Sequence, residues 1–221
     1  MNKKEGVNIL AETHKIIANI IYDEVEYQYG IKLDSDKLTW WSIAPDYLPK
    51  YKFIRHYKDE SINYIVNEIL KTIILTKYVD ISIVPQEIGI ASLSKKIGII
   101  SHYLTDYVCY PHAQRWTFSD SMVKHVKYEN NLNEFAKTYD FANPQTKINI
   151  PDIDLYSLNL FNTKKTIKKY IDEIVDEYSH SASFINDLDF ATFINKKITF
   201  FIIDSLRESV LEGQDALAFQ I

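Results

Sequence analysis

Apolar residues recur every three to four positions over long windows of this chain, which is the spacing of one face of an α-helix. Only five glycines and six prolines occur among 221 residues, so few positions favour a turn or a strand boundary. The pattern predicts an all-α fold. The length suits one domain, and we expect residues 1–221 to form a single-domain multi-helix bundle.

Helix ends are expected where glycine or proline follows or precedes an apolar stretch. Gly30 suits a left-handed cap, Pro85 suits the first turn of a helix, and Pro111 is expected to end that helix. Two segments are predicted to be irregular: 40–58, with six aromatic residues and two prolines, and 141–162. The expected helices span about 8–29, 59–78, 85–110, 119–139, 163–180 and 187–212.

Composition excludes several classes of protein. A net charge of −5 gives no basic stripe, so we expect no tight nucleic-acid partner. The single Cys109 excludes an internal disulfide and suits a small buried side chain. The first residues contain no clean apolar signal region, and no apolar run is long enough to span a bilayer, so a cytoplasmic location is expected.

Histidines and carboxylates are grouped in a way that predicts metal binding. His102 and Asp106 lie four residues apart, as do His125 and Glu129, so each pair shares one face of a helix. Imidazole nitrogens and carboxylate oxygens are ligands for Zn²⁺, and two such helices can build a metal cluster in a bundle. One pair alone is usually an exposed helix pair. Two pairs with His112 between them favour a metal site.

The order of these residues resembles the zinc-dependent phospholipase C family, which shares its helical fold and metal site with single-strand nucleases. The family pattern is His, then Asp and His, then H-x-x-x-D, then His, then H-x-x-x-E. Residues 130–221 carry no such motif and are expected to complete the bundle. The matching positions are His14, Asp46, His56, His102, Asp106, His112, His125 and Glu129.

The resemblance implies two or three zinc ions. One would be held by Asp46, His56, His102 and Asp106, and a second by His112, His125 and Glu129. Asp106 would bridge to a third, shared with His14. In secreted relatives an N-terminal tryptophan completes that third site, whereas this chain has no tryptophan before Trp40. The third site is therefore expected to be vacant, or to be completed by water or by a group such as Glu12.

The resemblance also implies a substrate pocket. Tyr47 and Phe53 match aromatic positions that help to bind the choline headgroup, and a quaternary ammonium is attracted to aromatic faces. Packing is the alternative role for each ring. The implied partner is a phospholipid headgroup or another phosphodiester, with a transient membrane contact. The apolar run at 73–75 fits either such a contact or the core.

The implied reaction is phosphodiester hydrolysis. Zinc lowers the pKa of a bound water so that hydroxide can attack phosphorus, with Asp46 as ligand and general base. Two alternatives remain open: a nuclease using the same metals, and a non-catalytic protein with closed zinc sites. A di-iron bundle needs two Glu-x-x-His pairs, and the sequence has one, Glu177 with His180, so His180 is expected at a helix end.

Overall fold

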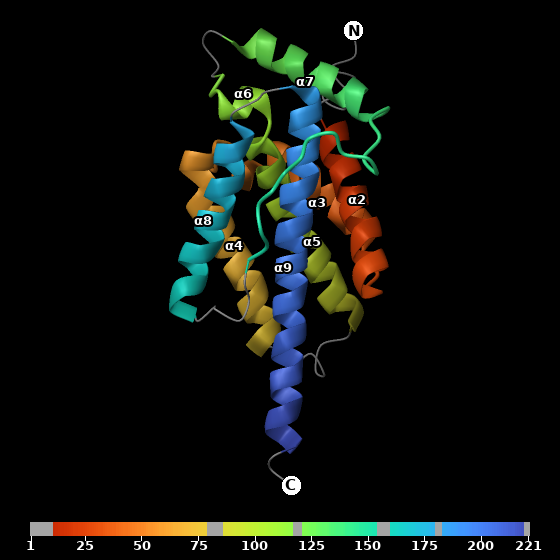
Figure 1. The fold of residues 1–221 in the computed structure, drawn as a ribbon, viewed down its shortest axis with the longest axis vertical. Coiled ribbons are helices and arrows are strands. Elements are labelled where there is room, and N and C mark those ends of the chain that lie inside the picture. The colour runs from red at the N-terminus through yellow and green to blue at the C-terminus, as the bar shows by residue number, and fades with distance from the viewer. Residues whose placement is uncertain (1–10, 79–85, 117–120, 154–159, 180–182, 219–221) are drawn as a thin grey trace.

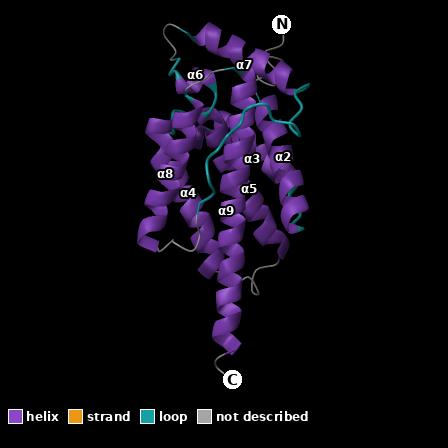
Figure 2. Cartoon of the chain, viewed as in Figure 1, coloured by secondary structure: helices purple, strands orange, loops and turns teal. Residues whose placement is uncertain are grey.

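The computed structural model describes residues 11–78, 86–116, 121–153, 160–179 and 183–218. Within these ranges the chain forms eight α-helices, one short 3₁₀ helix and no strand (Figure 2), so the predicted all-α class is confirmed. The helices are α2 (Glu12–Tyr29), α3 (Ser35–Tyr47), η1 (Pro49–Tyr51), α4 (Lys58–Tyr78), α5 (Gln86–Tyr107), α6 (Tyr110–Ala113), α7 (Met122–Ala136), α8 (Leu160–Tyr178) and α9 (Phe184–Ala218).

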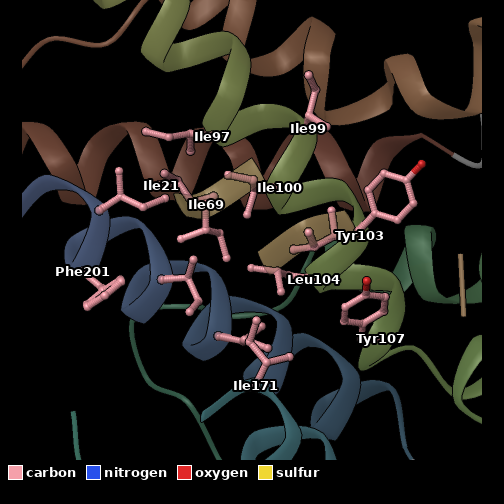
Figure 3. Close-up of a cluster of buried hydrophobic side chains, with 14 of the residues drawn as sticks. Ile21, Ile69, Ile97, Ile99, Ile100, Tyr103, Leu104, Tyr107, Ile171 and Phe201 are labelled. Carbon is pink, nitrogen blue, oxygen red and sulfur yellow. The ribbon is translucent and has the colours of Figure 1, made fainter. Parts of the chain in front are cut away.

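Helix α9 runs along the long axis of the molecule, and the other long helices run alongside it (Figure 1). The exception is α7, which lies across one end of the bundle. The core between them is built from isoleucines and tyrosines; Figure 3 shows Ile69, Leu104 and Ile171 meeting from three helices. Tyr103 and Tyr107 on α5 are fully buried there. Helix α5 therefore passes through the centre of the bundle and carries its polar residues into a buried environment.

Residues 40–47 are helical, and the prediction that they are irregular is wrong. Asp34 caps α3 by accepting a 2.9 Å hydrogen bond from the Lys37 backbone N–H, and the helix then continues through Pro45 to Tyr47. Pro45 removes one backbone bond in the last turn, but the side chain is buried. Packing of α3 on α5 outweighs that local loss.

Other boundaries also differ from the prediction. Helix α5 ends at Tyr107, before Pro111, and Pro111 lies in the first turn of the short helix α6, where a missing N–H costs little. Helix α9 continues past Gly213 to Ala218. Ser119 and His180 lie outside the described residues. Gly30 is confirmed as a left-handed cap, with φ of 66°.

The exposure of individual side chains tests two further predictions. Cys109 is 6% exposed, as predicted for a small buried side chain. In the apolar run at 73–75, Ile73 packs against the core and Ile74 is 38% exposed. Over the described ranges, no helix is both long enough and apolar enough to cross a membrane.

Candidate metal centre

The eight residues singled out in the sequence lie close together, and two of them are on α7, the helix that lies across one end of the bundle (Figure 1). They come from helices distant in sequence, with the segment before α4 supplying one imidazole. Helix α5 supplies two of them from one face, as the four-residue spacing predicted. By element they are His14 on α2, Asp46 on α3, His56 before α4, His102 and Asp106 on α5, His112 on α6, and His125 and Glu129 on α7.

Four ligand atoms lie close enough together to suit the corners of one tetrahedral site, and we call this group the tetrahedron. Asp46 Oδ1 lies 3.5 Å from both His56 Nδ1 and His102 Nε2, which are 3.4 Å apart. Asp106 Oδ2 lies 2.9 Å from His56 Nδ1 and 3.4 Å from His102 Nε2. Ligands bound at 2.0–2.1 Å to one tetrahedral zinc are about 3.3 Å apart. These spacings therefore suit four groups around one shared cation.

A second group lies beside the first. Glu129 Oε1 is 2.8 Å from His125 Nε2 and 3.1 Å from His112 Nε2. All three side chains are half-buried, so the group borders solvent on one side. Three protein ligands with an open position are typical of a catalytic zinc site.

The other carboxylate oxygen of Asp106 faces a different pair of imidazoles. Asp106 Oδ1 lies 3.4 Å from His14 Nε2 and 3.6 Å from His112 Nε2. Asp106 thus presents one oxygen to the tetrahedron and the other toward His14. Glu12, the suggested substitute for the absent tryptophan, is 2.7 Å from Lys15 Nζ and is not part of these groups.

Backbone carbonyls orient two of the imidazoles. His102 Nδ1 donates to the Ser42 carbonyl at 2.8 Å, so Nε2 carries the lone pair that can bind a metal ion. His125 Nδ1 donates to the Trp116 carbonyl at 3.2 Å. Trp116 is placed by a turn in which Arg115 has φ of 50° and the Trp116 N–H bonds to the Pro111 carbonyl at 2.9 Å.

The electrostatics of the metal-free site favour protonated His14 and His56, a neutral His102, and ionised Asp106 and Glu129. Burial lowers the pKa of His102 to about 4. For His14 and His56 burial also lowers the pKa, but the hydrogen bond and charge of Asp106 outweigh it and raise the pKa above its usual value. Burial raises the pKa of Glu129, but His112 and His125 outweigh it and lower that pKa to about 2. Positive charge is therefore attracted to the site.

A cavity of about 430 Å³ opens over the carboxylates and imidazoles. Its apolar and aromatic wall includes Tyr47, Tyr57, Trp116, Met122 and Val126. A cavity with an apolar wall and a few polar groups is typical of a small-molecule site. Asp46 is the most exposed ligand candidate, with 39% of its side chain accessible, so it faces the cavity.

Tyr47 and Phe53, the two predicted headgroup residues, lie in different environments. Tyr47 lines the cavity, which is where a headgroup-binding residue would have to lie. Its ring packs against Trp40, with 6.2 Å between the ring centroids. Phe53 is 93% exposed and is not among the residues that line the cavity. The structure therefore brings only Tyr47 to the site.

Sequence reasoning missed several residues of this site. The carbonyls of Ser42 and Trp116 act through the backbone, which leaves no residue-type signal. Asn133 accepts a 2.8 Å hydrogen bond from the Thr13 backbone N–H, which satisfies an unpaired donor at the start of α2 beside His14. The four-residue spacing from Glu129 to Asn133 is the signal that could have found it.

Comparison with known families gives one match. The family model for zinc dependent phospholipase C matches residues 13–185, which covers every one of the predicted ligand positions. Comparisons with curated proteins and with solved structures found no match.

Proposed function

The chain belongs to the zinc-dependent phospholipase C family, and from this we propose that it is a zinc-dependent hydrolase of phosphodiesters, acting on a phospholipid or a related ester. The observation that carries the proposal is the tetrahedron of Asp46, His56, His102 and Asp106. Four of its measured edges are 3.4–3.5 Å, too long for strong hydrogen bonds and suited to ligands of one ion.

The buried oxygen of Asp106 supports a bound cation. Asp106 is 3% exposed, and its Oδ2 lies 2.9 Å from His56 Nδ1 but makes no hydrogen bond of good geometry within the described residues. A buried carboxylate oxygen whose hydrogen bonding is incomplete is costly. A metal ion among the four ligand atoms would remove that cost, so the residues fit zinc.

In this proposal the tetrahedron holds one zinc, and His112, His125 and Glu129 hold a second. His14 and Asp106 Oδ1 supply two ligands of a third. Bound zinc makes a coordinated water more acidic and offsets the negative charge of the phosphoryl group. Asp46 is the most exposed of the ligands that line the cavity, and we assign it the role of accepting the proton from the attacking water.

The cavity wall favours a substrate with a cationic or aromatic group beside the phosphate. Tyr47, Tyr57 and Trp116 offer ring faces, which attract a quaternary ammonium such as choline. Met122 also lines the cavity, and Val123 beside it is 83% exposed. This apolar edge would lie against the acyl chains or the membrane surface when a lipid headgroup enters.

The test compares metal content with hydrolysis. His102→Ala and Glu129→Ala should each lose zinc and reduce hydrolysis of a phosphorylcholine ester at least 100-fold, because each removes a ligand. Glu134→Ala is the matched control, since Glu134 lies on the same helix as Glu129 and is paired with Lys137 at the surface. It should keep the zinc content and the rate of the wild type.

Three outcomes would change the conclusion. Faster hydrolysis of single-stranded oligonucleotides than of the choline ester would make the chain a nuclease with the same metal ligands. Full zinc content with no hydrolysis of either substrate would make it a non-catalytic zinc protein. Unchanged zinc content and activity in both ligand variants would refute the proposed centre.

A further inference from the structure

A buried carboxylate on α9 lies near the metal centre, and within the described residues its hydrogen bonds are to groups other than the candidate ligands. Asp187 is 2% exposed and accepts three hydrogen bonds. The Tyr178 hydroxyl donates to Oδ1 at 2.7 Å, and the Tyr128 hydroxyl donates to Oδ2 at 2.8 Å. The Tyr110 backbone N–H donates to Oδ2 at 3.3 Å.

These three donors belong to three different helices. Tyr110 begins α6, two residues before His112, and Tyr128 on α7 directly precedes Glu129. Tyr178 ends α8, which carries none of the proposed ligands. One side chain of α9 therefore fixes both helices that supply the group His112, His125 and Glu129.

The environment keeps Asp187 an acceptor at neutral pH. Burial raises its pKa to about 6, and the three donors oppose that rise. Above that pH the ionised carboxylate accepts from both tyrosine hydroxyls, and such charge-assisted bonds are stronger than neutral ones. Tyr128 and Tyr110 also pack against each other with ring centroids 5.7 Å apart, so the start of α6 is in direct contact with the middle of α7.

A small cavity links Asp187 to the centre. It has a volume of about 20 Å³, and Asp187, His14, Asp106 and Glu129 all line it. A space of that size holds about one water molecule. A shift of Asp187 would therefore displace the candidate ligands that line this space, in addition to its effect through α6 and α7.

We propose that Asp187 is a positioning residue for the second metal site: through Tyr110 and Tyr128 it holds α6 and α7 at the separation that lets His112, His125 and Glu129 bind one ion. The inference rests on the proposed function, because it needs a metal at that group. Partners that fix metal ligands typically change metal affinity 10–100-fold when removed.

The test uses two tyrosines bonded to the same carboxylate. Tyr128→Phe and Asp187→Asn should weaken zinc at the second site about 10–100-fold, measured by competition with a chromogenic chelator. Both should also change the visible absorption of Co²⁺ bound there. Tyr178→Phe is the matched control. It removes a buried hydroxyl bond to Asp187 but no link to α6 or α7, so it should lower the melting temperature and leave zinc affinity within about twofold.

Wild-type zinc affinity and Co²⁺ spectrum in both Tyr128→Phe and Asp187→Asn would overturn the role of Asp187. Equal loss of affinity in Tyr178→Phe and Tyr128→Phe would also overturn it, because the effect would then follow general stability. A wild-type protein that takes up no zinc would refute the proposed metal centre itself. If Asp187→Asn does not fold, Tyr128→Phe decides the question.

Discussion

Gly98 on α5 lies in close contact with α3, and replacing it with alanine should separate the two helices. An added Cβ would lie 2.7 Å from the Leu38 carbonyl oxygen, 2.9 Å from Trp41 Cβ and 3.0 Å from the Ser42 backbone nitrogen. Two of these atoms belong to the backbone and the third is a Cβ, so rotation of a side chain cannot relieve the contacts. Relief requires α3 to move by about half an ångström or more.

The expected cost can be worked from two opposing effects. Alanine favours a helix over glycine by about 1 kcal/mol, whereas overpacking a tight contact typically costs about 1–3 kcal/mol. With contacts at or below 3.0 Å to backbone atoms, the cost should be at the upper end of that range or beyond it. We expect Gly98→Ala to lose about 2 kcal/mol of unfolding free energy, which lowers the melting temperature by about 4–8 °C.

The same shift should disturb the metal site. Ser42, whose nitrogen the new methyl group meets, supplies the carbonyl that orients His102, and Asp46 lies one turn further along α3. Zinc affinity of the tetrahedral site should fall with stability. Gly89→Ala is the control on the same helix, because its Cβ would meet nothing within 4 Å. It should gain up to about 1 kcal/mol. A Gly98→Ala protein as stable as Gly89→Ala would refute the close contact of α3 and α5.

Three further predictions concern the neighbourhood of the metal centre. Arg115→Gly should raise the unfolding free energy by up to about 1 kcal/mol relative to Arg115→Ala in urea unfolding, because glycine adopts the observed φ of 50° without strain; equal stability of the two variants would contradict a left-handed turn there. Asn133→Leu should cost about 1–3 kcal/mol, since it leaves the buried Thr13 N–H without its acceptor, and a melting temperature within 1 °C of the wild type would argue against this bond. The pKa values of His14, His56 and His125 are raised in the metal-free protein, so the stability that their protonation contributes is fully present below about pH 6.5 and is lost as pH rises through the raised values. Chelator-treated protein should therefore melt at a lower temperature at pH 8 than at pH 6, zinc uptake near pH 6.5 should release protons in calorimetry, and uptake without proton release would refute the assignment of these histidines as ligands.

The candidate ligands could be selected from the sequence because their order and spacing are local. His102 with Asp106, and His125 with Glu129, share helix faces by geometry alone, and the structure brings both pairs to one place. Convergence of the two pairs depends on how α7 crosses the end of the bundle, which no local spacing gives. The family resemblance supplied that arrangement, and the geometry agrees with it.

Features that depend on the folded backbone or on contacts between distant segments could not be predicted from the sequence. The segment around Pro45 was expected to be a loop because of its aromatic residues and prolines, yet contact with α5 at Gly98 stabilises it as a helix. Phe53 matched a headgroup position, but the direction of its side chain depends on the irregular turn before His56. Asp187 lies 58 residues after Glu129 and meets α7 only in the folded chain.

From the charges of the site we expect two tightly bound zinc ions. Asp46, Asp106 and Glu129 supply three negative charges, and the histidines must be neutral to bind metal. Without metal, the raised pKa values of His14 and His56 favour their protonated, positively charged forms. Two divalent ions would offset the three carboxylates and leave a single positive charge, which would offset the single negative charge of one phosphodiester.

A third ion would leave three positive charges in a half-buried site unless another anion joined it. Among the described residues, the nearest acidic candidate on α2 is Glu12, and its carboxylate is paired with Lys15. His14 and Asp106 Oδ1 alone supply too few ligands for a closed tetrahedral site. Titration with Zn²⁺ should therefore give two tight ions per chain and a third that binds more weakly and is strengthened by inorganic phosphate. Three ions of equal affinity without added anion would show that this charge argument is wrong.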